Sequence, residues 1–264
     1  MKRFINDVKK FFNYSSYNVK AELKSEVAGS FLSWLWWILD PLLYMLVYAF
    51  VAKIIFGAGS KPYFLVFVFI GLNCWQFFNR VVRNSVKLVS NKKSIVTKVY
   101  IPKYMFVFEK IGISGFKTLV SFVITAMFMV YYKVPLSWNM LWVPPLLIML
   151  AIVTFAFSTI IMHFGVFVED LLNIVTVGLQ LVFYLSGIFY DIADRLAAKH
   201  SRLCSLLMYG NPVALIMTDI RNALLYNGQP HFLALGIWLA VCLVISAIGV
   251  KIIYKYENSY VKII

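Results

Sequence analysis

The stretch Trp34–Phe50, WLWWILDPLLYMLVYAF, carries the features that decide the fold. It is apolar except for Asp40, and tryptophans at one end of an apolar run are typical of a helix anchored at a membrane–water interface. Pro41 removes a backbone donor and predicts a kink. Because a carboxylate is costly in hydrocarbon, Asp40 is expected to face protein or water. The stretch therefore predicts a membrane helix with one polar face.

Apolar runs of this kind recur along the whole chain. They lie near 31–56, 63–78, 104–132, 143–168, 171–190 and 232–254. At about 1.5 Å per residue, each crosses or nearly crosses a hydrocarbon core of about 30 Å. The hydrophobic content of 62% and the mean hydropathy of +0.81 also exceed those of ordinary soluble domains. The predicted fold class is an all-α membrane protein with six transmembrane helices, forming one domain over residues 31–264 after a leading segment 1–30.

The basic charge is unevenly distributed. Six crossings place both termini on one side, and most of the 25 Lys and Arg residues then lie on that side. The positive-inside rule makes this side the cytoplasm. The same rule accounts for the net charge of +14 without nucleic acid, and it places basic loops against anionic lipid.

The leading segment predicts an amphipathic helix. Phe12, Val19, Leu23 and Val27 share one helical face, and charges of both signs occupy the rest. Such a helix would lie along the cytoplasmic membrane interface. A simple topogenic leader is the alternative.

Two segments outside the spans have patterns of their own. The basic loop 85–103 predicts a short helix that begins at Ser90 or Asn91 and ends before Pro102. It either docks into a soluble partner or is an ordinary positive-inside loop. The outer region 191–230 has apolar patches at 205–209 and 213–225, each too short for an ordinary crossing. They predict two short re-entrant helices on the outer side before the last span.

Two polar stripes run along predicted spans. They comprise Trp37, Asp40, Tyr44 and Tyr48 in the first span, and Asn173, Thr176, Gln180 and Tyr184 in the fifth. Each stripe has helical spacing. Aromatic rings stack on the C–H faces of sugars, while phenol and amide groups hydrogen-bond sugar hydroxyls. The stripes either line a path for carbohydrate or hold helices together through polar contacts.

Other kinds of site lack support in the sequence. There is no paired His/Cys spacing for a metal and no P-loop for ATP. His163 and Asp170 can share a face and exchange a proton, although a lone buried histidine is more often structural. The sparse set Asp40, His163, Glu169 and Asp170 does not favour a membrane acyl- or glycosyltransferase. A passive channel or secondary carrier lacks its expected inverted repeat.

Several of these stretches resemble one family, the transmembrane permease subunit of bacterial type-2 ABC exporters of cell-surface polysaccharides (O-antigen, capsule and teichoic acid). Trp34–Phe50 is similar to its W…(N/D/E)PLL…VY first span, and Ile101-Pro102-Lys103 to its (F/I)P(R/K) element. Tyr184–Tyr190, YLSGIFY, and Asn211–Gly228 are similar to its YLSP(V/I)FY and NP…R.ALL..G patterns. The chain departs from the family in having Gly187 at the usual proline, Glu169-Asp170 at the usual Arg-Asp, and no proline at 105–108.

The resemblance implies a homodimer with two copies of a separate ABC nucleotide-binding subunit. That subunit would bind ATP and Mg²⁺, so this chain would be no enzyme and would bind no cofactor. It would lie in the bacterial plasma (inner) membrane with both termini cytoplasmic. It would export a polysaccharide or teichoic-acid polymer carried on a polyprenyl pyrophosphate lipid. A type-2 exporter of a small hydrophobic drug or lipid is the alternative with the same fold.

The resemblance also implies roles for particular residues. Coupling to the ATPase would involve Ser90, Asn91, Lys92, Lys93, Ser94, Ile95 and Val96. The two stripes of the first and fifth spans would line the channel. The outer gate would contain Gly187, Tyr190, Asn211 and Pro212.

Overall fold

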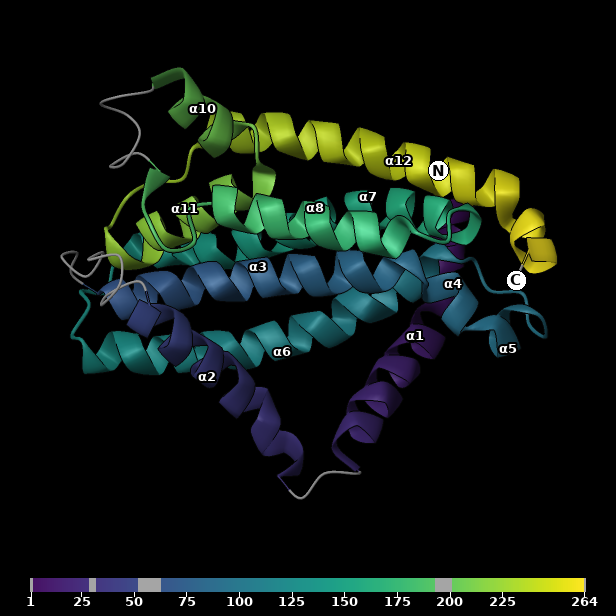
Figure 1. The fold of residues 1–264 in the computed structure, drawn as a ribbon, viewed down its shortest axis with the longest axis horizontal. Coiled ribbons are helices and arrows are strands. Elements are labelled where there is room, and N and C mark those ends of the chain that lie inside the picture. Colours follow the sequence, from purple (N-terminus) through teal and green to yellow (C-terminus); the bar gives the residue numbers. More distant parts are fainter. Residues whose placement is uncertain (1, 29–31, 52–62, 193–200, 264) are drawn as a thin grey trace.

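The computed structural model describes residues 2–28, 32–51, 63–192 and 201–263, which form a bundle of helices (Figure 1). The helices are α1 (Lys2–Ala28), α2 (Trp36–Phe50), α3 (Phe64–Val86), α4 (Leu88–Asn91), α5 (Lys93–Val96), α6 (Tyr104–Tyr131), α7 (Val143–Phe167), α8 (Leu171–Leu185), α10 (Ser201–Tyr209), α11 (Pro212–Leu225) and α12 (Phe232–Ile263). Short 3-10 turns precede α2 (Ser33–Leu35) and α7 (Trp138–Trp142). The all-α prediction is therefore confirmed for the described residues.

Not all of the six predicted spans are long apolar helices in the structure. Within the described ranges, four helices are long and apolar enough to cross a membrane: α3, α6, α7 with its preceding turn, and α12. The helices α10 and α11 meet at 91° and add a fifth if they count as one span. The predicted first and fifth spans correspond to the shorter apolar helices α2 and α8. Residues 31 and 52–56 of the first predicted span, and 193–200 of the outer region, lie outside the described residues.

The second predicted span is longer than expected, because α3 continues past residue 78 to Val86. The buried apolar face of α3 continues through the part of the helix that carries charged residues. Val81, Val82 and Val86 are buried, while Arg80 and Arg83 occupy another face. The charges that suggested a loop are therefore on the helix itself.

The helix α3 is the axis of the bundle. Among the long apolar helices it has the largest buried share, 78% of its most apolar window, against 17% for α12. Its apolar side chains pack in one cluster with those of α7 and α11. A polar face on α3 therefore faces other helices and the space between them.

The N-terminal segment is a helix, as predicted, but the predicted face is partly wrong. Phe12 is 62% exposed, whereas Phe11 packs against the cluster that includes Tyr104 and Phe106 of α6. At this point Phe11, and not Phe12, lies on the buried face of α1, because that face packs on the surface of α6. The placement of α1 on a membrane surface stays a prediction.

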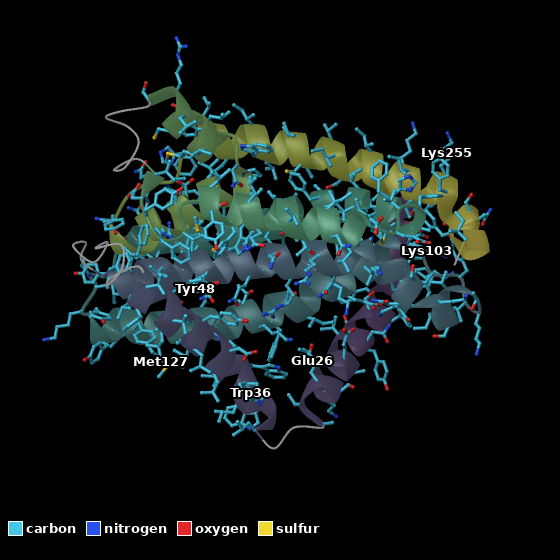
Figure 2. The ribbon with its side chains drawn as sticks, in the orientation of Figure 1. Glu26, Trp36, Tyr48, Lys103, Met127 and Lys255 are labelled. Atoms are coloured by element: carbon cyan, nitrogen blue, oxygen red, sulfur yellow. The ribbon has the colours of Figure 1, made fainter. Side chains whose placement is uncertain are left out.

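Both ends of the described chain lie at the same end of the bundle as α4 and α5 (Figure 1). Direct contacts hold them there. Asp7 accepts hydrogen bonds from Tyr104 at 3.2 Å and from Tyr254 at 2.6 Å, and Arg3 pairs with Glu257 at 3.2 Å. Figure 2 shows Lys103 and Lys255 at this end and Tyr48 toward the opposite end.

Candidate functional site

A groove of about 690 Å³ lies between α2, α3 and α8. It brings together most of the two predicted stripes, with Asp40, Tyr44 and Tyr48 contributed by α2, and Thr176, Gln180 and Tyr184 by α8. Trp37 lies outside the groove, where its ring packs edge-on at 5.2 Å against Phe116 of α6. Asn173 is exposed in the first turn of α8 and does not line the groove. The helical spacing of the stripes thus translates into one shared concave surface.

The third wall of the groove was not expected from the sequence. It is a polar face of α3 with Gln76, Asn79, Arg80, Arg83 and Asn84, extended by Lys87 directly after the helix. These charges were expected only to set the membrane topology. Their spacing of three or four residues within an apolar helix was the signal that they share one face.

Aromatic rings form a connected set along the groove. Tyr44 and Tyr48 stack with centroids 6.4 Å apart and an interplanar angle of 17°. Tyr48 lies 5.9 Å from Phe183, which in turn lies 5.7 Å from Trp75. Tyr44 and Tyr184 are 53% and 59% exposed, so their rings are available for stacking.

A small polar chamber of about 50 Å³ adjoins the groove between α2, α3 and α6 and shares Asp40, Gln76 and Arg80 with it. This volume is large enough for a water molecule. Asn73 lines the chamber, is 3% exposed, and has no hydrogen-bond partner for its Nδ2 among the described residues. Lys117 lines it too and pairs with Glu26 of α1 at 2.6 Å. Figure 2 shows Glu26 and Trp36 where α1 and α2 approach each other.

The predicted coupling segment is folded as two single helical turns, α4 and α5, that meet at Lys92. The prediction of one short helix beginning at Ser90 or Asn91 is therefore wrong in detail. The interruption coincides with an ion pair between Lys92 and Glu109 of α6, a carboxylate that is fully buried. Glu109 also accepts a hydrogen bond from Asn18 of α1 at 3.1 Å. One carboxylate thus joins the coupling segment, α1 and α6.

The coupling residues divide into inner and outer positions. Val96 is 6% exposed and belongs to the apolar cluster at this end of the bundle, and Ile95 packs partly against it. The exposed coupling residues are Ser90, Asn91, Lys93 and Ser94. The segment therefore presents a polar and basic face outward and rests on an apolar one.

The Ile101-Pro102-Lys103 element follows the coupling segment and is not helical, as the proline predicted. Lys103 is 3% exposed, and its ammonium lies 5.6 Å from the centroid of the Tyr100 ring. Burial lowers the pKa of Lys103, and the nearby Glu257 carboxylate opposes that shift. The element thus buries a basic side chain within electrostatic range of a carboxylate of the C-terminal helix.

The four predicted gate residues come together at the opposite end of the bundle. Asn211 accepts hydrogen bonds from the amides of Val213 at 3.0 Å and Ala214 at 3.3 Å, and so caps α11, whose first residue is Pro212. Its Nδ2 donates to the Ser186 hydroxyl at 2.8 Å. In the same turn, Tyr190 donates to the carbonyl of Tyr184 at 3.0 Å. Gly187 has φ +67°, a conformation that glycine adopts freely.

Arg221 holds this turn and was missed as a functional residue. It is 3% exposed and donates to three main-chain carbonyls: Phe67 at 3.0 Å, Gly187 at 2.9 Å and Ile188 at 2.8 Å. Its guanidinium also lies 3.5 Å from the centroid of the Phe67 ring. No role was predicted for Arg221 from the sequence, although it is the arginine of the NP…R pattern.

His163 has a structural environment. Its Nδ1 lies 2.7 Å from the hydroxyl of Tyr260, and Phe164 and Phe167 surround its ring. Across the part of the chain that the structure describes, His163 makes no recorded contact with Asp170, and no group of three or more His, Cys, Asp or Glu side chains could hold a metal ion.

Comparison with known proteins supports the resemblance. The chain is 26% identical over 244 residues, 92% of each chain, to an O-antigen export system permease protein RfbA of Klebsiella pneumoniae. It is 27% identical over 202 residues, 76% of each chain, to a protein of the same name from Myxococcus xanthus. No family model matches the chain. The similarity to polysaccharide-exporter permeases predicted from a few motifs is thus confirmed over most of the sequence.

Proposed function

We propose that this chain, which resembles O-antigen export permeases over most of its length, is the membrane permease subunit of an ATP-driven polysaccharide exporter. The groove is the observation that carries the proposal, because it joins aromatic faces with amide and hydroxyl groups along one path. This combination suits a polymer with alternating C–H faces and hydroxyls. The proposed cargo is a polysaccharide or teichoic-acid polymer on a polyprenyl pyrophosphate lipid.

The composition of the groove distinguishes this cargo from the alternative. A small hydrophobic drug or lipid needs an apolar wall. Here Gln76, Asn79 and Gln180 place amide groups opposite the tyrosines, and these amides need polar partners. The groove therefore favours a hydroxyl-rich cargo.

The groove also supports a homodimer. The helices α2 and α8, which form two of its walls, expose apolar side chains such as Val47, Val177 and Leu181. A second copy packed on this side would cover these side chains and close the groove into a channel. We propose that the channel forms between two copies of the chain in the bacterial plasma membrane, with both termini cytoplasmic.

We expect a Tyr44→Ala/Tyr184→Ala variant to export polymer about tenfold less, because each lost stacking face removes about 0.5–1.5 kcal/mol of interaction with the cargo. Assembly and basal ATP hydrolysis of the complex should be unchanged. The measurement is surface polymer on cells that depend on the variant. An Ile148→Ala/Leu243→Ala variant is the matched control, since it truncates exposed apolar side chains on α7 and α12. Equal export by both variants would assign the tyrosines to helix packing only.

The proposed partner is a separate ATPase subunit in two copies, which would bind the ATP and Mg²⁺ that this chain has no motif to hold. The exposed face of the coupling segment supports docking at this end of the bundle. We expect Ser94→Trp to abolish co-purification with the ATPase, because a bulky ring at an exposed docking position prevents close packing. Ser201→Trp, at the start of α10 at the other end of the bundle, is the control. Undiminished co-purification with Ser94→Trp would place the docking surface elsewhere.

A further inference from the structure

The groove ends in a row of cations at the end of α3 that adjoins α4. Arg80, Arg83 and Lys87 line it at helical spacing on one face. Among the described residues, no carboxylate lies within ion-pair distance of any of the three. Asp40 is the acidic residue of the groove lining. The groove thus has an excess of positive charge at this end.

Topology alone does not account for the position of Arg80. A charge that only sets orientation can lie at any exposed position near the membrane surface. Arg80 is instead half-buried within the most buried of the long helices and points into the groove. A guanidinium partly withdrawn from water is costly unless anions or water surround it. The carboxylates of Asp40 and Glu26 lie close enough to favour its charge, although neither forms an ion pair with it among the described residues. With Arg83 and Lys87 beside Arg80, three cations still exceed these two carboxylates.

The row lies at the level where lipid phosphates are expected. On α3, residues 64–79 carry no charge and Arg80 begins the charged part, while on α6 residues 118–131 carry no charge and Lys117 ends it. Arg80 and Lys117 line the same small chamber, together with Trp36. Tryptophan beside the first charges of neighbouring helices is typical of the headgroup level of a membrane.

We propose that Arg80, Arg83 and Lys87 bind the phosphate or diphosphate headgroup of a lipid at the foot of the groove. Two guanidinium groups and an ammonium match the geometry of phosphate oxygens. A polymer attached to this headgroup would lie next to Trp75 and the tyrosines. The identity of the lipid as a polymer carrier rests on the proposed function, whereas the binding of its headgroup does not.

Direct binding tests the site. The complex of the full chain with its ATPase is placed in phosphatidylcholine nanodiscs, and undecaprenyl diphosphate or undecaprenol is titrated with native mass spectrometry as readout. We expect Arg80→Gln/Arg83→Gln/Lys87→Gln to weaken binding of the diphosphate lipid at least tenfold and to leave undecaprenol unchanged. The control is Lys24→Gln/Lys98→Gln/Lys255→Gln, which removes the same charge at exposed positions outside the groove and should change binding less than twofold.

Two further titrations identify the ligand chemistry. Competition by phosphatidylglycerol would show that the site accepts any lipid phosphate, and resistance to it would show preference for a diphosphate; either result supports the site. Equal loss of binding in both triple variants, or tighter binding of inorganic pyrophosphate than of the lipid, would overturn it. This binding measurement does not depend on transport. Binding of the lipid would support the headgroup site even in an exporter of another cargo. Failure to bind would overturn the headgroup site and leave the proposed polysaccharide export standing.

Discussion

A Gly187→Pro variant is expected to lose export and to show a much lower melting temperature than the native chain. The proline ring fixes φ near −65°, whereas residue 187 has φ +67°. The turn would have to rebuild, and the carbonyls of Gly187 and Ile188 would move away from Arg221. The buried guanidinium would then lose two acceptors, each costing about 1–3 kcal/mol.

Gly187→Ala provides the graded control. Alanine at positive φ costs about 1–2 kcal/mol, and its Cβ would lie 2.6 Å from Cγ1 of Ile192, a side-chain atom that can shift. We expect the melting temperature to be highest with Gly187, lower with Gly187→Ala and lowest with Gly187→Pro. The measurement is fluorescence-detected size-exclusion chromatography after heating. Since the resembling family often has proline at this position, a stable Gly187→Pro variant would show that this chain adopts the family's turn and not the one described here.

The second large effect is expected at the carboxylate that joins three elements. Lys92→Met removes the cation that pairs with the fully buried carboxylate of Glu109. Among the described residues, the amide of Asn18 is then the remaining partner of this carboxylate. Breaking a buried ion pair by removing one partner costs about 3–5 kcal/mol. We expect α1 and the coupling segment to loosen together, so that hydrogen exchange increases in both and the ATPase no longer responds to the permease.

A double-mutant cycle separates this ion pair from general damage. Lys92→Met/Glu109→Met removes both charges and should recover most of the lost stability, because no unpaired charge then remains buried. Lys98→Met, at an exposed position in the same loop, is the matched single control and should be neutral. Additive losses in the double variant would contradict the ion pair.

Helical periodicity in the sequence was enough to predict much of this structure. It placed helices over most of the described chain and put Asp40, Tyr44 and Tyr48 on one face. The short apolar patches 205–209 and 213–225 likewise predicted two short helices, which are α10 and α11 in the structure. Each helix depends on residues that are neighbours along the chain. Spacing along the chain is therefore sufficient to predict it.

The features that were missed depend on contacts between distant segments. The partners of Arg221 are main-chain carbonyls, which every residue possesses, so no pattern of side chains signals them. The basic residues of α3 were interpreted as signals of membrane orientation, because a basic loop and a basic groove wall have the same amino-acid composition. The choice between Phe11 and Phe12 on α1 was settled by the surface of α6, which lies far along the chain.

The attachment of α1 has a consequence for biogenesis. Glu22 and Glu26 of α1 pair with Lys110 and Lys117, and Arg3 pairs with Glu257. The ribosome releases α1 before α6 and α12, so two hydrophobic segments, α2 and α3, are translated before Lys110 and Lys117 and more before Glu257. During that interval the exposed aromatic side of α1 has no partner within the nascent chain. Membrane insertion of the first hydrophobic segments and the final packing of α1 are therefore separate events in time.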